Sequence, residues 1–369
     1  MKKIISLLLV SVLVLLTFCL TGCSSSNDNV AILWSGEDTA TVPGSLIDCM
    51  ERSMYTENIS YKHYGAKGDA AAQLEQAKTV LNDGCAVLIV ELVSDTYAQE
   101  IVDAAKEKTV PVVFFNCNVS DEVINSYDKC VLVVPDENTI NSVQGLLIAD
   151  YVKANFKDID KNEDNKITVI NCGFSAEDVA EIITKVNEIL ATDDYKVSRD
   201  FLGFTNKFNT SVELSDSTFD ADSVADYEML LAIDDTTAYE LLVELQKQDY
   251  NTDKLKEKFV PIITVGDKFD YKALVLNGRP ENPDDYKAYY EANKFLVDLT
   301  AVKEEDLGAM IYTTINVIDS GRISGTVIVD NDSVTAAVAK IAKNFISGED
   351  FFQVVSGKVK VSFKSYISG

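Results

Sequence analysis

The sequence predicts an α/β protein made of two doubly wound lobes, each built on a parallel sheet. Short β-branched apolar runs alternate with amphipathic, helix-like segments, as expected when parallel strands are covered by helices on both faces. This alternation stops once and then restarts. The roughly 345 residues behind the N-terminal segment suit two domains better than one.

The first 22 residues are predicted to form a secretory signal peptide. Lys2 and Lys3 supply a positive start, and the apolar run that follows is too short and wrongly flanked for a membrane span. The sequence Leu-Thr-Gly-Cys ending at Cys23 resembles the bacterial lipobox, so we expect Cys23 to be lipidated, with residues 23–29 as a polar tether. The alternative is an uncleaved anchor. Both alternatives place the body of the protein outside the cytoplasmic membrane.

The first lobe is predicted to contain residues 30–136, with a return of the chain at about 330–350. Each predicted strand is a short apolar run, and the helical pattern before Gly84 ends where a glycine stop belongs. The predicted strands are Val30–Trp34, Ile59–Gly65, Cys85–Leu92, Val110–Asn116 and Lys129–Pro135.

The second lobe is predicted to contain residues 137–329 and about 351–369. Its predicted strands are Ile167–Gly173, Tyr227–Ile233 and Val260–Asp267. A charged, tyrosine-rich insert follows at about 271–306. This insert is either a lid or partner surface, or a solvated excursion of the chain.

Composition excludes several classes of function. Asp and Glu number 59 against 33 Lys and Arg, so the formal charge of −26 disfavours nucleic acid and anionic lipid surfaces as partners. His63 is the single histidine and no C-x-x-C occurs, which argues against a zinc site or a Ser-His-Asp triad. No glycine-rich phosphate loop is present. We therefore expect a binding protein and not an enzyme.

Polar residues follow the predicted strands at the edge where doubly wound sheets bind ligands. Carboxylates and amides beside an aromatic ring suit a neutral polyol, because they accept from hydroxyl pairs while the ring offers a flat apolar face. The alternative is that these residues cap the following helices. The candidate ligand-binding residues are Trp34, Asp38, Asn116, Asp178, Asp234 and Asp267.

The stretch "DKNEDNKIT" carries oxygen-bearing side chains at its first, third, fifth and ninth positions. These are Asp160, Asn162, Asp164 and Thr168. Oxygen ligands at such spacing suit a calcium ion, because Ca²⁺ prefers carboxylate, amide and carbonyl oxygen. A plain acidic surface turn is the alternative.

Residues Val110–Phe156, "VPVVFFNCNVSDEVINSYDKCVLVVPDENTINSVQGLLIADYVKANF", resemble the periplasmic galactose/glucose-binding proteins of the type I periplasmic-binding-protein family. The phrases "VPVVFFN", "SYDK" and "QGLLIADY" carry the likeness. It implies two lobes joined by a hinge, a monosaccharide bound between them, and delivery to the permease of an ABC importer. It further implies a monomer, while the lipobox-like sequence at Cys23 predicts that this monomer is anchored to the membrane.

The same resemblance implies one structural Ca²⁺ as the cofactor. Its ligands would be the side chains of Asp160, Asn162, Asp164 and Thr168, the Lys166 carbonyl and, from a later strand, Glu228. Thr168 is shorter than the amide side chain of the family, so water can supply the ninth ligand. Asn165 stands where such loops place glycine, and asparagine tolerates the left-handed backbone needed there.

The ligand residues depart from the family pattern. Asn116 matches it, and Asp178 fits the Asp of a His-x-Asp-x-x-x-Arg cluster, but Ala176 and Ile182 stand in place of the His and the Arg. Loss of the guanidinium and imidazole removes charge-assisted hydrogen bonds, and an amine-bearing ligand becomes a hypothesis.

Further departures concern single positions. Asp38 matches only approximately, and Asp234 and Val329 replace asparagines of the family. Phe204 or Phe208 would have to supply the second stacking ring.

Three alternatives remain open from the sequence. The chain could be a sensor subunit that presents its ligand to a membrane receptor, or a binding protein with altered or lost specificity. A secreted glycosidase with a carboxylate pair is the enzyme alternative.

Overall fold

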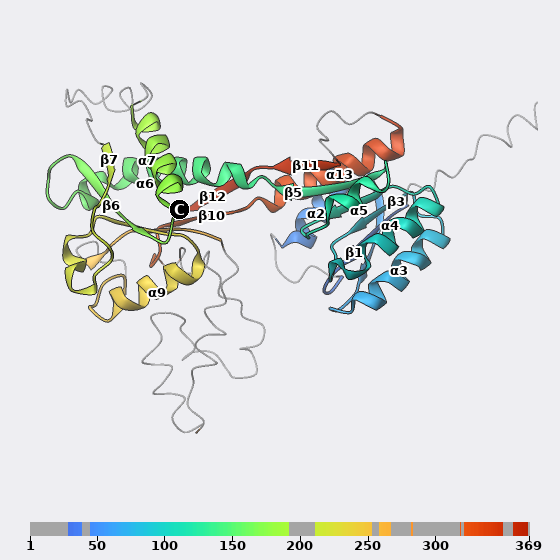
Figure 1. Ribbon diagram of the computed structural model, residues 1–369, viewed down its shortest axis with the longest axis horizontal. Helices are drawn as coiled ribbons and strands as arrows, with labels where there is room; N and C mark the ends of the chain where they lie inside the picture. The colour runs from blue at the N-terminus through green and yellow to red at the C-terminus, as the bar shows by residue number, and fades with distance from the viewer. Residues whose placement is uncertain are drawn as a thin grey trace, which may run out of the picture. The chain divides into compact units, whose positions relative to one another are not determined.

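The computed structural model describes residues 29–38, 45–191, 211–252, 258–266, 282, 318, 321–349 and 357–367 (Figure 1). The expectations for the signal peptide and Cys23 lie outside these residues. So do those for Phe204, Phe208 and Asp267 and, apart from Asn282, for the insert at 271–306.

The described residues form two compact units, and the chain passes between them three times. The crossings follow Val134, Asp330 and Val361. The prediction of two α/β lobes is confirmed. One boundary was wrong: Lys358–Val361, expected in the second lobe, pairs with the first sheet because the chain crosses only after this strand.

The first unit is a six-stranded sheet in the order β11-β5-β4-β3-β1-β2. Strands β1 to β5 run parallel to one another, as predicted. The strands are β1 (Asn29–Trp34), β2 (Ser60–Gly65), β3 (Val87–Val90), β4 (Val112–Phe115), β5 (Cys130–Pro135) and β11 (Lys358–Val361). The helices are α2 (Leu46–Thr56), α3 (Ala70–Asn82), α4 (Ala98–Glu107), α5 (Asp121–Asn125) and α13 (Asn331–Ser347), with a 3-10 turn η1 (Asp95–Tyr97).

Both faces of this sheet are buried, which explains why its strands read as continuous apolar runs. Alternate residues of β1 point to opposite faces. Ala31 and Leu33 pack in one core with α3 and α4. Ile32 and Trp34 are also buried, on the face that α2 and α13 cover (Figure 1).

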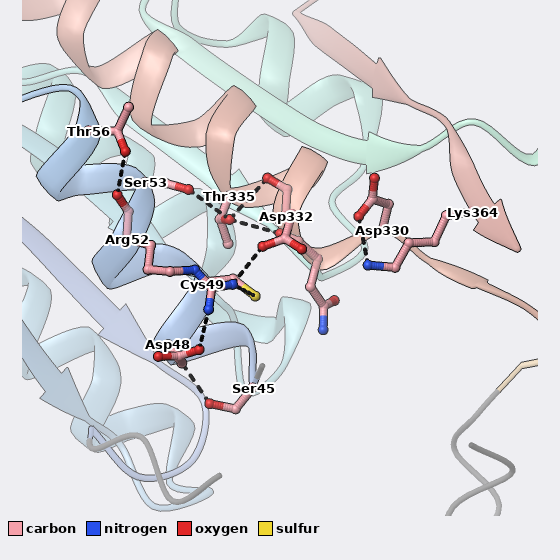
Figure 2. Close-up of polar contacts among 11 residues, drawn as sticks. Ser45, Asp48, Cys49, Arg52, Ser53, Thr56, Asp330, Asp332, Thr335 and Lys364 are labelled. Carbon is pink, nitrogen blue, oxygen red and sulfur yellow. Dashed lines mark hydrogen bonds and ion pairs between the residues drawn. The ribbon is translucent and has the colours of Figure 1, made fainter. Parts of the chain in front are cut away.

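Ion pairs lie on both sides of the second crossing (Figure 2). On the side of the second unit, Lys364 Nζ lies 3.0 Å from Asp330 Oδ1. On the side of the first unit, Asp332 at the start of α13 pairs with Arg52 of α2. Asn331 is the one residue between the two anchored carboxylates.

The second unit is also six-stranded, in the order β12-β10-β9-β8-β6-β7, and is parallel except for the β10–β12 pair. The strands are β6 (Lys166–Cys172), β7 (Ser211–Leu214), β8 (Met229–Ala232), β9 (Ile262–Val265), β10 (Gly325–Val329) and β12 (Phe363–Ile367). The helices are α6 (Ile140–Ile159), α7 (Ala176–Leu190) and α9 (Asp235–Gln246), with 3-10 turns η2 (Glu137–Thr139) and η3 (Ala221–Asp226).

Two apolar cores cover the two faces of this second sheet, one with α9 and one with α6 and α7. Helices α6 and α7 approach closely at Gly145, where an added Cβ would lie 2.8 Å from the Lys185 side chain. Because β6, β8 and β9 run parallel, their carboxyl ends lie at the same edge of the sheet.

The five cysteines of the described residues are free thiols: Cys49, Cys85, Cys117, Cys130 and Cys172. Burial raises their pKa to about 11, and that of Cys130 to about 12. Within the part of the chain that the structure describes, no helix is both long and apolar enough to span a membrane.

Candidate functional site

Trp34 does not offer a stacking face. The side chain is 2 % exposed, its ring meets Phe115 edge-on, and Nε1 donates to His63 Nδ1 over 2.8 Å. The expectation of an exposed ring was wrong because Trp34 is the last residue of β1 and points into the sheet's covered face. Burial lowers the pKa of His63, which keeps the imidazole neutral and able to accept this bond.

A hydrogen-bonded polar group lies instead beyond the ends of β1, β3 and β4. Glu91 stands at its centre, directly after β3. Its Oε2 accepts from the hydroxyl of Ser35 over 2.8 Å and from the Ser35 amide over 3.2 Å. Its Oε1 accepts from Asn116 Nδ2 over 2.5 Å. We call Ser35, Glu91 and Asn116 the acceptor triad; it contains one of the predicted ligand residues.

The backbone around the acceptor triad is fixed by a buried glutamine of α3. Gln73 Nε2 donates to the carbonyls of Glu91 (2.8 Å) and Trp34 (3.3 Å), and its Oε1 accepts from the amide of Val93 over 3.0 Å. One side chain thus ties the ends of β1 and β3 together.

Asp38 lies in the turn after β1, half-buried beside the end of β2. An added Cβ at Gly65 would lie 2.9 Å from both the Asp38 amide nitrogen and the Gly36 carbonyl oxygen. A glycine is therefore needed at the end of β2 for this turn to pack there.

In the second unit, Asp178 belongs to a polar group between α6 and α7. Its Oδ2 accepts from the Ser175 hydroxyl over 2.6 Å, and its Oδ1 accepts from Asn141 Nδ2 over 3.1 Å. The same amide group donates to Glu181 Oε2 over 2.8 Å. The Ser175 and Asn141 bonds lower the pKa of Asp178, so its carboxylate is ionised at neutral pH.

Ile182 is fully buried in the core of the second unit. An arginine at this point of α7 would face apolar side chains, so the departure from the family cluster is a change of packing as well as of charge. Ala176, the position matched to the family's His, is the first residue of α7 and is exposed.

Asp234 is the N-cap of α9, and its Oδ1 accepts from the Thr237 amide over 2.8 Å. The capping alternative therefore describes what this carboxylate does in the structure. The next residue, Asp235, is 8 % exposed and faces Gly266, where an added Cβ would lie 2.8 Å from Asp235 Oδ2.

The Asp160–Thr168 stretch folds as a tight loop between α6 and β6. Asn165 has φ +64°, so the prediction that it takes the left-handed position is confirmed. Side-chain oxygens of the loop accept from its own backbone: Asn162 Oδ1 from Asp164 N (2.9 Å), Asp164 Oδ1 from Lys166 N (2.8 Å) and Asp160 Oδ2 from Asn165 N (3.2 Å).

Glu228 reaches this loop from the residue before β8. It is 2 % exposed, and its two carboxylate oxygens accept from the amides of Lys161 (3.0 Å) and Thr168 (2.7 Å). Burial raises the pKa of Glu228, against the lowering effect of these backbone donors. The carboxylate itself thus closes the loop onto the sheet.

The loop fits a cation only in part. Asp160 Oδ1 is buried without a hydrogen-bond partner among the described residues, as a metal ligand would be. Both oxygens of Glu228 are engaged by backbone amides, however, and the described ranges contain no cluster of three or more His, Cys, Asp or Glu side chains that could hold a metal ion.

Sequence reasoning missed the central residue of the acceptor triad. Glu91 lay inside the predicted strand Cys85–Leu92, whereas β3 ends at Val90. The signal was a single carboxylate closing an apolar run, "VLIVE", in the same kind of position as Asn116 after β4. Asn141 and Glu181 gave no comparable signal, because they lie on helices.

Comparison with known proteins gives a family match and several relatives. A sequence model of the periplasmic binding protein domain matches residues 47–303. The D-galactose/methyl-galactoside binding periplasmic protein MglB of Haemophilus influenzae is 36% identical over 114 residues, which are 31% of this chain and 34% of that protein. The match spans about a third of that relative's length.

Two solved structures have similar folds at low identity. An ABC transporter solute binding protein from Bacillus halodurans with bound myo-inositol is 14% identical, covering 94% of this chain and 96% of that one, with a TM-score of 0.42. GanP, a glucose-galactose binding protein from Geobacillus stearothermophilus, is 11% identical, covering 92% and 96%, with a TM-score of 0.40. At these scores the two likenesses add no argument to the family match.

Proposed function

Because the chain belongs to the periplasmic binding protein domain family, we propose that it is the solute-binding component of an ABC importer and carries a monosaccharide outside the cytoplasmic membrane. The family is one of binding proteins. Binding requires no chemical step, so we propose no enzymatic activity for this chain.

One observation carries the proposal within this family: the acceptor triad at the carboxyl ends of β1, β3 and β4. Ligands of doubly wound sheets bind at this edge. Asn116 there is exposed and held by Glu91 over 2.5 Å, and an amide fixed in this way can hydrogen-bond a sugar hydroxyl. The galactose-binding relative supports a hexose as the first ligand to test.

Calorimetric titration of the purified protein with D-glucose and D-galactose tests the proposal. We expect saturable binding that Asn116→Ala weakens at least about tenfold, since a ligand hydrogen bond is removed. Asn58→Ala is a matched control, because Asn58 is also exposed and also has a positive φ, +55° against +49° for Asn116. Flat traces from folded protein would exclude both sugars.

Altered specificity is a second candidate, favoured by the burial of Ile182 where the family has an arginine. An amine-bearing sugar is the ligand we propose in this case, because Asp178 is ionised and Asp38 lies on the corresponding edge of the first unit. Titration with D-glucosamine and D-galactosamine against the neutral sugars tests it. Equal affinities for the neutral and the amino sugars would count against this candidate.

We also propose that a structural Ca²⁺ binds at the Asp160–Thr168 loop. Asp160, Asn162, Asp164, the Lys166 carbonyl, Thr168 and Glu228 would hold it, and the unpartnered Asp160 Oδ1 supports the proposal. Chelator-treated protein should gain thermal stability with Ca²⁺, and Asp160→Asn should reduce the gain. The exposed neighbour Asp158→Asn is the control. No Ca²⁺ dependence in the unaltered chain would mean that Glu228 alone closes the loop.

Lipidation of Cys23 is the proposed membrane anchor. Mass spectrometry of the N-terminal peptide from membranes should show a diacylglyceryl group on this cysteine. Cys23→Ala should move the protein from the membrane to the soluble fraction.

A further inference from the structure

We propose that Glu91 is a positioning residue that fixes the Asn116 amide with Oδ1 toward the ligand, so that this edge selects sugar groups that donate a hydrogen bond. The inference rests on the proposed function and names a specificity determinant for it.

The orientation of the amide follows from the acid beside it. A carboxylate only accepts hydrogen bonds, so the Asn116 nitrogen, and not its oxygen, must face Glu91 Oε1. Reversing the amide would place two oxygens 2.5 Å apart. Asn116 Oδ1 accepts no hydrogen bond from the other described residues, and it is therefore the atom that remains for a ligand.

Glu91 has little freedom to turn away from Asn116. Its second oxygen is held by two donors of Ser35, and its own carbonyl is held by the buried side chain of Gln73. Because Gln73 also binds the Trp34 carbonyl, one side chain links the ends of β1 and β3. The acceptor is thus arranged before the ligand arrives, which lowers the entropic cost of binding.

A carbonyl oxygen that faces the ligand only accepts hydrogen bonds. It therefore distinguishes ligand groups that can donate a hydrogen bond from groups that cannot. A hydroxyl or an ammonium group donates to Asn116 Oδ1, whereas fluorine or an ether oxygen at the same position does not. A ligand oxygen that cannot donate meets only the lone pairs of Asn116 Oδ1, so no hydrogen bond forms and the group is disfavoured.

The test compares D-galactose with its singly fluorinated and singly O-methylated analogues by calorimetry. In the unaltered protein, one ring position should lose at least about tenfold in affinity on fluorination. Glu91→Ala frees the amide to rotate and present Nδ2–H, so the loss at that position should shrink to about threefold or less. Glu122→Ala, an exposed carboxylate of α5 in the same unit, should leave the ratio unchanged.

A second readout needs no ligand. The Asn116 side-chain amide proton that is donated to Glu91 should exchange more slowly in nuclear magnetic resonance spectra of the ligand-free protein than in those of Glu91→Ala. Galactose binding to both proteins with the same loss of affinity on fluorination would overturn the inference and leave the proposed function standing. Equal amide exchange rates in the unaltered protein and Glu91→Ala would do the same. Flat titrations with every sugar overturn the proposed function and, with it, the assignment of Glu91 to sugar selection.

Discussion

Arg52 Nη2 lies 2.7 Å from Asp332 Oδ1, although the two residues are 280 positions apart in the sequence. The guanidinium also donates to Asp48 Oδ2 over 2.6 Å, so it bridges α2 and the first turn of α13 (Figure 2). Beside it, Ser53 Oγ donates to Thr335 Oγ1 over 3.0 Å. The returning chain is thus attached to the first unit within two residues of the crossing.

Removing this bridge should weaken the attachment of α13. Arg52→Met keeps the apolar stem but loses both ion pairs, and we expect a modest fall in the midpoint of thermal unfolding. Because the pairs are exposed, the difference from the unaltered protein should vanish in 1 M NaCl, where the screening length is about 3 Å. Lys78→Met breaks an ion pair within α3 alone and should have a smaller effect. A difference that persists at high salt would contradict this account.

Asn251 is buried in the second unit and has a left-handed backbone conformation, with φ +53°. Its Nδ2 donates to the carbonyls of Val260 (2.8 Å) and Arg322 (3.0 Å), and its Oδ1 accepts from the Val260 amide over 2.8 Å. Asn251→Asp would point a carboxylate at two carbonyl oxygens. We expect a loss of about 2–4 kcal/mol in the free energy of unfolding, measured with urea.

The matched control for Asn251 is Asn58→Asp, at an exposed residue with φ +55°. It should change the free energy of unfolding by less than about 0.5 kcal/mol. Equal effects at the two positions would show that the buried hydrogen bonds of Asn251 contribute little.

The Trp34–His63 bond predicts a loss of stability in acid. Burial lowers the pKa of His63 in the folded state, so below about pH 6.5 the unfolded chain binds a proton that the folded chain does not. The contribution of this residue is therefore complete above pH 6.5 and falls as the pH drops toward the folded-state pKa. Urea unfolding at pH 7.5 and 5.5, followed by Trp34 fluorescence, measures it.

The control for this prediction replaces the titrating group. In His63→Gln, the part of the pH dependence that comes from His63 should disappear while the carboxylates still titrate. An unchanged slope between pH 7.5 and 5.5 would rule out His63 as its source.

Asn165 predicts how the Asp160–Thr168 loop responds to glycine. With φ +64°, Asn165→Gly should be neutral or slightly stabilising, whereas Asn165→Ala should cost about 1 kcal/mol. Thermal unfolding in the presence of a chelator separates this backbone effect from any effect of Ca²⁺. A stabilising alanine would mean that the left-handed turn is not needed.

The sequence predicted the architecture well because buried parallel strands are continuous apolar runs. Each of the eight predicted strands overlaps a strand of the structure, and six of the eight contain the whole observed strand. Strand ends were harder to interpret, because an apolar run does not show where hydrogen bonding stops. The predicted strand ran two residues past the end of β3 and so included Glu91. At the end of β1, the sequence could not show that Trp34 points into the core.

Helix caps and ligand residues also share the same amino acids. Asp234 caps α9, while Asn116 is held by Glu91 with its carbonyl free, and both follow an apolar strand. Only the three-dimensional partners separate the two roles. The family resemblance, and not the sequence pattern, predicted that Glu228 lies beside the Asp160–Thr168 loop. Its hydrogen bonds to the Lys161 and Thr168 amides confirm that Glu228 contacts the loop.

The five free thiols of the described residues, all with a raised pKa, have a practical consequence for labelling. Maleimides react with the thiolate, and a thiol with a pKa of about 11 is deprotonated at pH 7 in roughly one molecule in ten thousand. A cysteine introduced at an exposed position would react orders of magnitude faster than these five. A single fluorophore can therefore be attached beside the acceptor triad while these five cysteines stay in place, and a change in its emission would report a ligand bound at this edge.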